Sequence, residues 1–137
     1  MSNAGKSAGT DAIIELTSSS FHSIVQAHEK LVVVEFYTTT CPNCAAIEPV
    51  YEELAWELHR YASFARINAQ VHVDVAQRFG ILGVPTFKFF CKKRPIGDIV
   101  GAVNATILRN TIKDFIKHRT ECASRSTPIS YEMDGYM

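Results

Sequence analysis

Two kinds of hydrophobic pattern alternate along the chain. Short apolar runs predict strands, and longer segments in which apolar residues recur every three or four positions predict helices. The clearest short run is Leu31 to Tyr37, which is apolar at nearly every position and therefore predicts a strand covered on both faces. Four further strands are predicted at residues 12–16, 64–67, 86–91 and 96–101.

The longest helical pattern begins at Pro42 and reaches about residue 60. Proline suits the first helical position, because the N–H that it lacks would have no partner there. Pro49 lies inside this helix and is expected to kink it. The apolar residues at helical spacing are Ile47, Val50, Tyr51, Leu54 and Leu58.

Three shorter helices complete the pattern. One is predicted at residues 21–28, with an N-cap among residues 18–20, and another at residues 73–79. The last helix is expected to start at Asn104 or Thr106. Its expected buried stripe consists of Ile107, Leu108, Ile112, Phe115 and Ile116.

The order of these elements alternates strand and helix until a final hairpin. It predicts an α/β fold in which a central mixed five-stranded sheet carries helices on both faces. The chain has 137 residues, the size of one domain, and 47% of them are apolar, which is enough for a packed core. We assign residues 11–119 to this domain, residues 1–10 to a flexible leader and residues 120–137 to a polar C-terminal tail that is expected to be mobile.

Composition narrows the classes of partner. Lys and Arg together number 14, as do Asp and Glu, so a net charge of zero gives no electrostatic reason to expect nucleic acid or an acidic membrane. No apolar stretch approaches the roughly 18 residues of a transmembrane helix, and residues 1–10 lack the apolar core of a signal peptide. Four cysteines do not make a disulfide framework at this length, so we expect a reducing compartment, the cytoplasm. We also expect the protein to be a monomer.

Cys41 and Cys44 carry the candidate chemistry. They form a Cys-x-x-Cys motif between a predicted strand and a predicted helix, and such a motif at this junction indicates a redox site. At the start of a helix, free N–H groups and the helix dipole stabilise a thiolate, which places cysteine pKa values at roughly 3.5–7.5 instead of about 8.5. Cys44 lies about one turn further along the same face, where it can attack a mixed disulfide formed by Cys41.

A structural disulfide or half of a zinc site would use the same two residues. A zinc site needs about four ligands, usually including a second pair. The remaining candidates, Cys91, Cys122 and five scattered histidines, form no such pair, so redox chemistry is favoured. Cys91 is expected to be a small buried hydrophobic residue, and Cys122 an exposed thiol of the tail.

With these motifs in this order, the chain resembles thioredoxin over about residues 12–118. The resemblance rests on the strand that ends in Glu35-Phe36-Tyr37 before the Cys-x-x-Cys motif, on Pro49 in the helix that follows, on the run Gly83-Val84-Pro85-Thr86, and on Gly101. It implies the thioredoxin fold, a cis peptide bond before Pro85, and thiol–disulfide exchange with protein substrates. Thioredoxin is also one of the proteins from which the range of thiol pKa values given above is drawn.

The sequence departs from the thioredoxin pattern around the site. Pro42-Asn43 replaces Gly-Pro between the cysteines, Thr40 replaces the tryptophan before the first cysteine, and Tyr37 replaces another aromatic residue. Ala45 stands where a basic residue often follows the second cysteine. These differences imply a partner surface unlike that of a housekeeping thioredoxin.

The resemblance places Glu35 where the family has a buried aspartate, and Arg66 where it has a nearby lysine. In a strand this apolar, burial would raise the pKa of Glu35 toward neutrality, which suits a proton acceptor for Cys44. Glu35 could instead be an exposed edge residue or a core carboxylate paired only for structure. Arg66 could be an ordinary surface residue, or it could pair with Glu35, keep it charged and lower its pKa.

The expected function is that of a protein disulfide oxidoreductase that exchanges a dithiol for a disulfide on protein substrates. The disulfide of the pair is itself the redox group, so no bound cofactor and no metal are expected, and a reductase or a small thiol would restore the dithiol. The alternative is a binding module with the same fold and an idle thiol pair. The expected catalytic residues are Cys41, Cys44 and Glu35, the substrate-binding residues Thr40, Pro42, Val84 and Pro85, and the supporting residues Arg66 and Tyr37.

Overall fold

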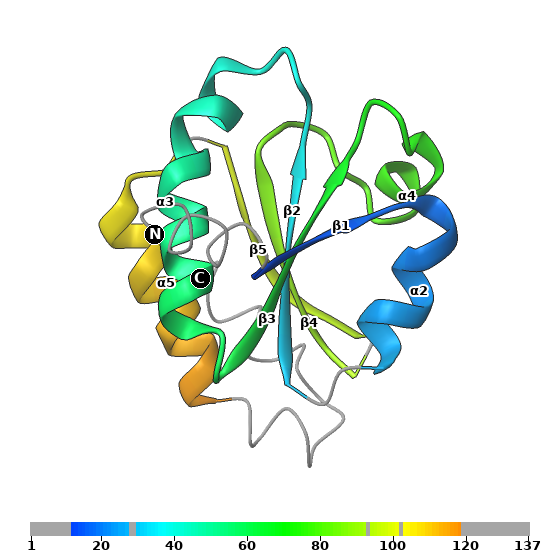
Figure 1. Ribbon diagram of the computed structural model, residues 1–137. Helices are drawn as coiled ribbons and strands as arrows, with labels where there is room; N and C mark the ends of the chain where they lie inside the picture. The colour runs from blue at the N-terminus through cyan, green and yellow to red at the C-terminus, as the bar shows by residue number, and fades with distance from the viewer. Residues whose placement is uncertain (1–11, 28–29, 93, 102, 119–137) are drawn as a thin grey trace, which may run out of the picture.

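A five-stranded sheet runs through the middle of the molecule, with helices on both of its faces (Figure 1). The computed structural model describes residues 12–27, 30–92, 94–101 and 103–118. The strands are β1 (Ile13–Leu16), β2 (Leu31–Tyr37), β3 (Ala62–Asn68), β4 (Thr86–Cys91) and β5 (Arg94–Val100). The helices are α2 (Ser18–Ala27), α3 (Pro42–Leu58), α4 (Val73–Arg78) and α5 (Ala105–Lys117).

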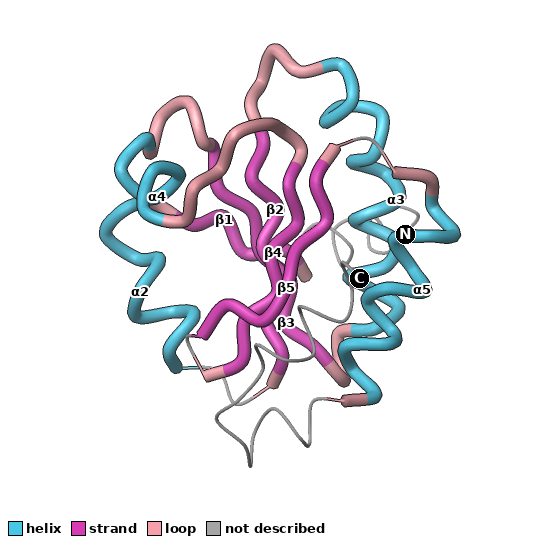
Figure 2. Tube along the Cα trace, turned by 180° about the vertical axis from the view of Figure 1, so that it is seen from behind, coloured by secondary structure: helices cyan, strands magenta, loops and turns pink. Residues whose placement is uncertain are grey.

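The strand order across the sheet is β1-β3-β2-β4-β5. β3 is parallel to both of its neighbours, whereas β4 is antiparallel to β2 and to β5. Parallel strands need a crossover connection, and α2 and α3 provide the connections into and out of β2. Figure 2 shows the result from behind, with α2 and α4 on one side of the sheet and α3 and α5 on the other. The predicted mixed sheet with two covered faces is confirmed.

The central strand β2 is buried on both sides, since every residue from Leu31 to Phe36 is buried. Side chains alternate along a strand, so Val33 and Glu35 face α3 and α5. The side chains that face α2 and α4 are those of Val32, Val34 and Phe36. Glu35 is therefore the one ionisable residue among the buried residues of β2.

The structure differs from the sequence prediction mainly at the ends of elements. α2 begins at Ser18 instead of residue 21, because the Thr17 hydroxyl oxygen accepts the Ser20 N–H at 3.2 Å and so caps the helix. At α5 the cap is Asn104, whose side chain accepts the Ile107 N–H at 2.8 Å. Ile107 is 49% exposed, so the prediction that it belongs to the buried stripe is wrong.

Strand ends differ for a similar reason. β3 has seven residues, more than its apolar centre predicts, because it pairs with a strand on each side. β5 begins at Arg94, two residues early, because Arg94 and Pro95 already lie opposite β4. The predicted leader at residues 1–10, the predicted tail at residues 120–137 and Cys122 lie outside the described residues.

Two residues of β4 take roles that the sequence did not indicate. Lys88 is buried on the side of α2 and α4, where its Nζ lies 3.1 Å from Oδ2 of Asp98 on β5, and this ion pair compensates for the burial of its charge. Cys91 is buried, as expected, but it is disulfide-bonded. The expectation that Cys91 acts only as a small hydrophobic residue is therefore wrong.

α3 is the longest of the described helices and continues through Pro49. The chain's one tryptophan, Trp56, lies near its C-terminal end. Trp56 is 51% exposed, and its ring stacks on that of His59 with the ring centroids 5.2 Å apart. None of the helices within the described residues is long and apolar enough to cross a membrane.

Candidate active site

The paired cysteines lie where β2 passes into α3. Cys41 is the N-cap of α3, with extended backbone angles of φ −94° and ψ 114°, and Pro42 is the first residue of the helix. The Cys44 N–H donates to Cys41 Sγ at 3.1 Å. The sulfur thus accepts one of the N–H groups that a helix leaves unpaired at its start. A thiolate on Cys41 would be stabilised by this bond and by the helix dipole.

The two thiols have different surroundings. Cys41 is half-buried, whereas Cys44 is only 3% exposed. Burial raises the pKa of the Cys44 thiol to about 12, and the hydrogen bond with Cys41 adds to this effect. Cys44 is therefore protonated at neutral pH and can act as a nucleophile only when a base takes its proton. The geometry gives Cys41 the accessible position and Cys44 the internal one.

The loop before β4 lies beside Cys41. Its peptide bond between Val84 and Pro85 is cis, as the resemblance implied. The Cys41 thiol donates to the Val84 carbonyl oxygen at 3.7 Å, and the Gly101 N–H donates to the Pro85 carbonyl oxygen at 2.8 Å. Gly101 has a φ of 91°, which glycine adopts without strain. The end of β5 therefore holds this loop against the cysteines.

The four predicted substrate-binding residues differ in exposure. Thr40 and Pro42 are exposed and flank Cys41 along the chain. Val84 is half-buried and Pro85 is buried, and the fold brings both of them to Cys41 from a distant part of the sequence.

Glu35 is buried close to the cysteines, on the side of β2 that faces α3. Its charge helps to raise the pKa of Cys44. The residue is 0% exposed, and neither carboxyl oxygen has a hydrogen-bond partner among the described residues. Burial raises the pKa of Glu35 from 4.5 to about 7, while the Arg66 charge acts against this shift and the Glu15 charge adds to it. The carboxyl group thus titrates near neutral pH, as a proton acceptor for a thiol should.

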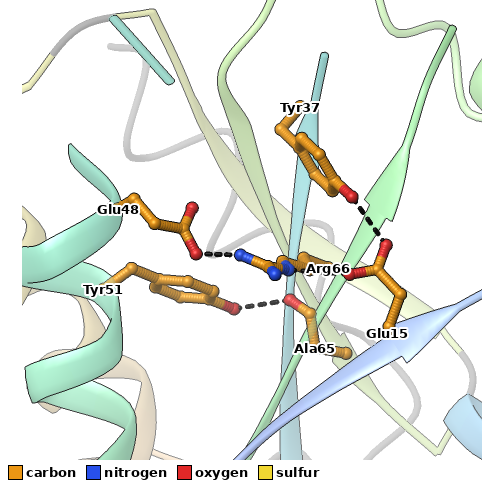
Figure 3. Close-up of polar contacts among 6 residues, drawn as sticks. All are labelled: Glu15, Tyr37, Glu48, Tyr51, Ala65 and Arg66. Carbon is orange, nitrogen blue, oxygen red and sulfur yellow. Dashed lines mark hydrogen bonds and ion pairs between the residues drawn. The ribbon is translucent and has the colours of Figure 1, made fainter. Parts of the chain in front are cut away.

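Arg66 does not pair with Glu35. Figure 3 shows its guanidinium between two other carboxylates: Nε donates to Glu15 Oε1 at 2.7 Å, and Nη1 donates to Glu48 Oε2. Its Cζ atom lies 5.3 Å from the centre of the Tyr37 ring, and the Tyr37 hydroxyl donates to Glu15 Oε2 at 2.7 Å. Of the alternatives open for Arg66, the ion pair with Glu35 is therefore not formed, and the residue belongs to a polar network beside the site.

Sequence reasoning missed both carboxylates that hold Arg66. Glu48 lies four residues after Cys44 and therefore on the same face of α3, a signal that is present in the sequence. Glu15 carries no such signal. Its place next to Arg66 follows only from the register in which β1 pairs with β3.

Tyr51 was predicted as an apolar contact of the helix, but its hydroxyl also has a role. The hydroxyl oxygen lies 2.7 Å from the Ala65 carbonyl oxygen of β3, a contact drawn in Figure 3. It also lies 3.0 Å from the Val33 carbonyl oxygen of β2, so both strands accept its proton. This proton is used by the strands and does not satisfy Glu35. Within the described part of the chain, no group of three or more His, Cys, Asp or Glu residues could hold a metal ion.

The mixed five-stranded sheet and the pair of cysteines at the start of α3 are those of the thioredoxin fold. A family model described as thioredoxin matches residues 12–114. The chain belongs to the thioredoxin family, and the predicted thioredoxin fold is confirmed.

Known relatives include longer and shorter proteins. The chain is 35% identical over 119 residues to protein disulfide-isomerase 2-3 of Arabidopsis thaliana, covering 84% of this chain and 27% of that protein. It is 30% identical over 105 residues to a thioredoxin of Mycobacterium tuberculosis, covering 77% of this chain and 90% of that one. It therefore spans about a quarter of the length of the plant relative and most of the length of the mycobacterial one.

A solved structure agrees with the fold. A mutant thioredoxin from Halobacterium salinarum NRC-1 superimposes with a TM-score of 0.68 at 24% sequence identity. The match covers 75% of this chain and 89% of that chain.

The unpaired Glu35 carboxyl should make stability depend on pH. The folded protein binds the Glu35 proton more tightly than the unfolded chain does. The contribution of this proton to stability is complete below about pH 4.5 and is lost as the pH rises through about 7. The shift corresponds to about 3.5 kcal/mol, because one pKa unit is about 1.4 kcal/mol. We expect the free energy of unfolding of Glu35→Gln, relative to wild type, to rise by up to this amount between about pH 5 and about pH 8.

Urea denaturation at several pH values measures this difference. Glu53→Gln, which removes an exposed carboxylate from α3, is measured at the same pH values as the control. A flat difference for Glu35→Gln would mean that Glu35 does not titrate in this range.

Cys41 should be the faster thiol toward an alkylating reagent. Its sulfur is half-buried at a helix start, whereas Cys44 is 3% exposed and holds its proton. Limited reaction of the reduced protein with iodoacetamide at neutral pH, followed by peptide mapping, should label Cys41 about tenfold more than Cys44. Cys41→Ser serves as the reference for the residual labelling of Cys44. Preferential labelling of Cys44 would reverse the two roles.

Proposed function

We propose that the protein exchanges its dithiol with disulfides of protein substrates through Cys41 and Cys44. The observation that supports this most is the asymmetry of the pair. The half-buried Cys41 sulfur accepts the Cys44 N–H at 3.1 Å, while the Cys44 thiol is buried behind it. An accessible sulfur at a helix start suits the attacking role, and a buried thiol one turn later suits the resolving role.

The first step is attack by the Cys41 thiolate on one sulfur of a substrate disulfide. A mixed disulfide forms between Cys41 and the substrate, and the second substrate sulfur leaves as a thiolate. The N–H of Cys44 and the helix dipole stabilise the attacking thiolate before it reacts.

The second step is resolution. Glu35 takes the proton of Cys44, whose thiolate then attacks the Cys41 sulfur and releases the remaining substrate thiolate. The substrate disulfide has gained two electrons, and Cys41 and Cys44 are now joined as a disulfide. A carboxyl group with a pKa of about 7 suits the acceptor role, because it is partly ionised at neutral pH.

The substrate would bind along the loop before β4. The Val84 carbonyl lies beside the Cys41 sulfur, and a segment of extended substrate backbone next to Val84 and Pro85 would pair with the loop as an added strand. Thr40 and Pro42 are exposed on either side of Cys41 and would contact the same segment.

The disulfide of the enzyme must be reduced again for a further cycle. A reductase or a small thiol would supply the two electrons, and the pair of cysteines needs no other cofactor for this step. The expectation of a reducing, cytoplasmic compartment stays a prediction. The disulfide at Cys91 counts against it, because disulfides persist mainly in oxidising compartments.

Reduction of insulin by dithiothreitol tests the proposed activity. Wild type should accelerate the reaction, and Cys41→Ser should leave only the uncatalysed rate, because the attacking sulfur is gone. Glu53→Gln, an exposed change on α3, should remain as active as wild type. A wild type that is no faster than Cys41→Ser would favour the alternative, a binding module with an idle thiol pair.

Replacement of Cys44 by serine should trap substrates on Cys41. Without the resolving thiol, the mixed disulfide persists, and a pull-down of Cys44→Ser should release covalently held proteins only when a reductant is added. The double variant Cys41→Ser/Cys44→Ser is the matched control and should release none. Equal recovery from both variants would mean that the captured proteins were not bound through Cys41.

A further inference from the structure

Arg66 lies in one row with two carboxylates. Glu15 on β1 and Glu35 on β2 are both its register partners in the parallel sheet, one on each side. Register partners point to the same face of a sheet, so the guanidinium could turn to either of them. It turns to Glu15 and to Glu48 on α3, and it leaves both oxygens of Glu35 without a partner among the described residues.

We propose that Glu15 and Glu48 are positioning residues for thiol–disulfide exchange: they hold Arg66 between them and so keep Glu35 free to accept the proton of Cys44. This inference rests on the proposed function and explains why a buried carboxyl group stays unpaired beside a cation. Glu15, Glu48 and Tyr37 are together called the Arg66 clamp below.

Exposure to solvent favours the clamp over a pair with Glu35. The side chains of Glu15 and Glu48 are 48% and 24% exposed, whereas Glu35 is 0% exposed. The two clamp carboxylates keep part of their hydration when they are ionised, but an ionised Glu35 loses all of it.

Charge balance acts in the same direction. The two carboxylates of the clamp already outweigh the single positive charge of Arg66, so ionisation of Glu35 would add a third negative charge to the cluster.

Tyr37 closes the clamp from the side of β2. Its hydroxyl donates to Glu15 Oε2 at 2.7 Å, while Arg66 Nε holds the other oxygen of the same carboxylate at 2.7 Å. Its ring also lies over the guanidinium, 5.3 Å from ring centre to Cζ. The two carboxylates that pair with Arg66 are thus held in place. Tyr37 holds Glu15, and its position on α3 holds Glu48.

An open clamp would change the chemistry of Glu35. Arg66 has five N–H donors, and without Glu15 and Glu48 the remaining register partner that could accept them is Glu35. A direct pair would keep Glu35 ionised well below neutral pH and make it a weaker base. The proton of Cys44 would then be transferred more slowly.

The other groups that face Glu35 do not do the work of the clamp. Cys44 and Tyr51 are the titratable side chains that α3 places near it, and the Tyr51 hydroxyl donates to strand carbonyls. β4 places Phe87 in register with Glu35, and α5 packs the apolar residues Leu108 and Ile112 into the same core. The Glu15 charge also acts directly on Glu35 and raises its pKa. We expect the larger part of the effect of the clamp on Glu35 to pass through Arg66.

A double-mutant cycle tests this route. The titration of Glu35 is followed by the 13C chemical shift of its carboxyl carbon in the reduced protein, with Glu35→Gln to assign the signal. The variants are Glu15→Gln/Glu48→Gln, Arg66→Met, the combination of all three changes, and Glu53→Gln as the exposed control.

The expected results differ in sign. Glu15→Gln/Glu48→Gln should lower the pKa of Glu35 by about one unit or more, because Arg66 is released toward it. Arg66→Met should raise that pKa, and in its background the two Gln changes should have less than half of their effect.

An equal fall in both backgrounds would mean that the carboxylates act directly through space, and no fall would mean that they do not act on Glu35. Either result would overturn the proposal. If the double variant does not fold, Glu48→Gln alone should give the same sign.

A kinetic measurement separates this proposal from the proposed function. Cys41 is converted to a mixed disulfide with thionitrobenzoate, and release of the coloured thiolate reports attack by Cys44. In Glu15→Gln/Glu48→Gln the acid limb of the pH profile of this release rate should move to lower pH, together with the titration of Glu35. An unchanged limb with full insulin reduction by wild type would refute the clamp and leave the exchange function standing. A wild type inactive on insulin with the expected shift of Glu35 would refute the function alone.

Discussion

The burial of one carboxyl group in the central strand is the constraint on which the rest of the site depends. β2 has neighbours on both sides and helices on both faces, so Glu35 has no access to water. A buried polar group without a partner costs about 1–3 kcal/mol. An apolar residue would avoid that cost, so the carboxyl group is retained at the expense of stability. The protonated form is the one that this environment tolerates, and the surrounding charges are placed where they do not force it to ionise.

The helix that carries the cysteines is attached to the strands that carry the charges. Tyr51 extends from α3 and donates to carbonyl oxygens of both β2 and β3. Glu48 extends from the same helix to Arg66 on β3. The thiols, the buried carboxyl group and the guanidinium therefore belong to one rigid arrangement, held by contacts that lie outside the reacting atoms. Catalytic groups held in this way need little reorganisation when they act.

Features encoded by neighbouring residues could be predicted from the sequence. The apolar run of β2, the Cys-x-x-Cys motif and Asn104 as one of two candidate caps are local patterns, and the structure contains each of them. The ion-pair partners of Arg66 could not be predicted from the sequence. They depend on the register of β1 against β3 and on which of three nearby carboxylates the guanidinium contacts. The start of α2 was misplaced because three serines in a row hid the cap at Thr17. The face of α5 was misjudged at Ile107 because an apolar residue beside the buried stripe looks the same as one within it.

The position of the one tryptophan decides what optical spectroscopy can report. Thr40 stands before Cys41, so no indole ring lies beside the thiols, and Trp56 is twelve residues beyond Cys44, about 18 Å along the helix. Its emission is set by its contact with His59 and by solvent. Tryptophan fluorescence of this protein therefore reports on the C-terminal end of α3 and on unfolding. It does not report whether the cysteines are oxidised.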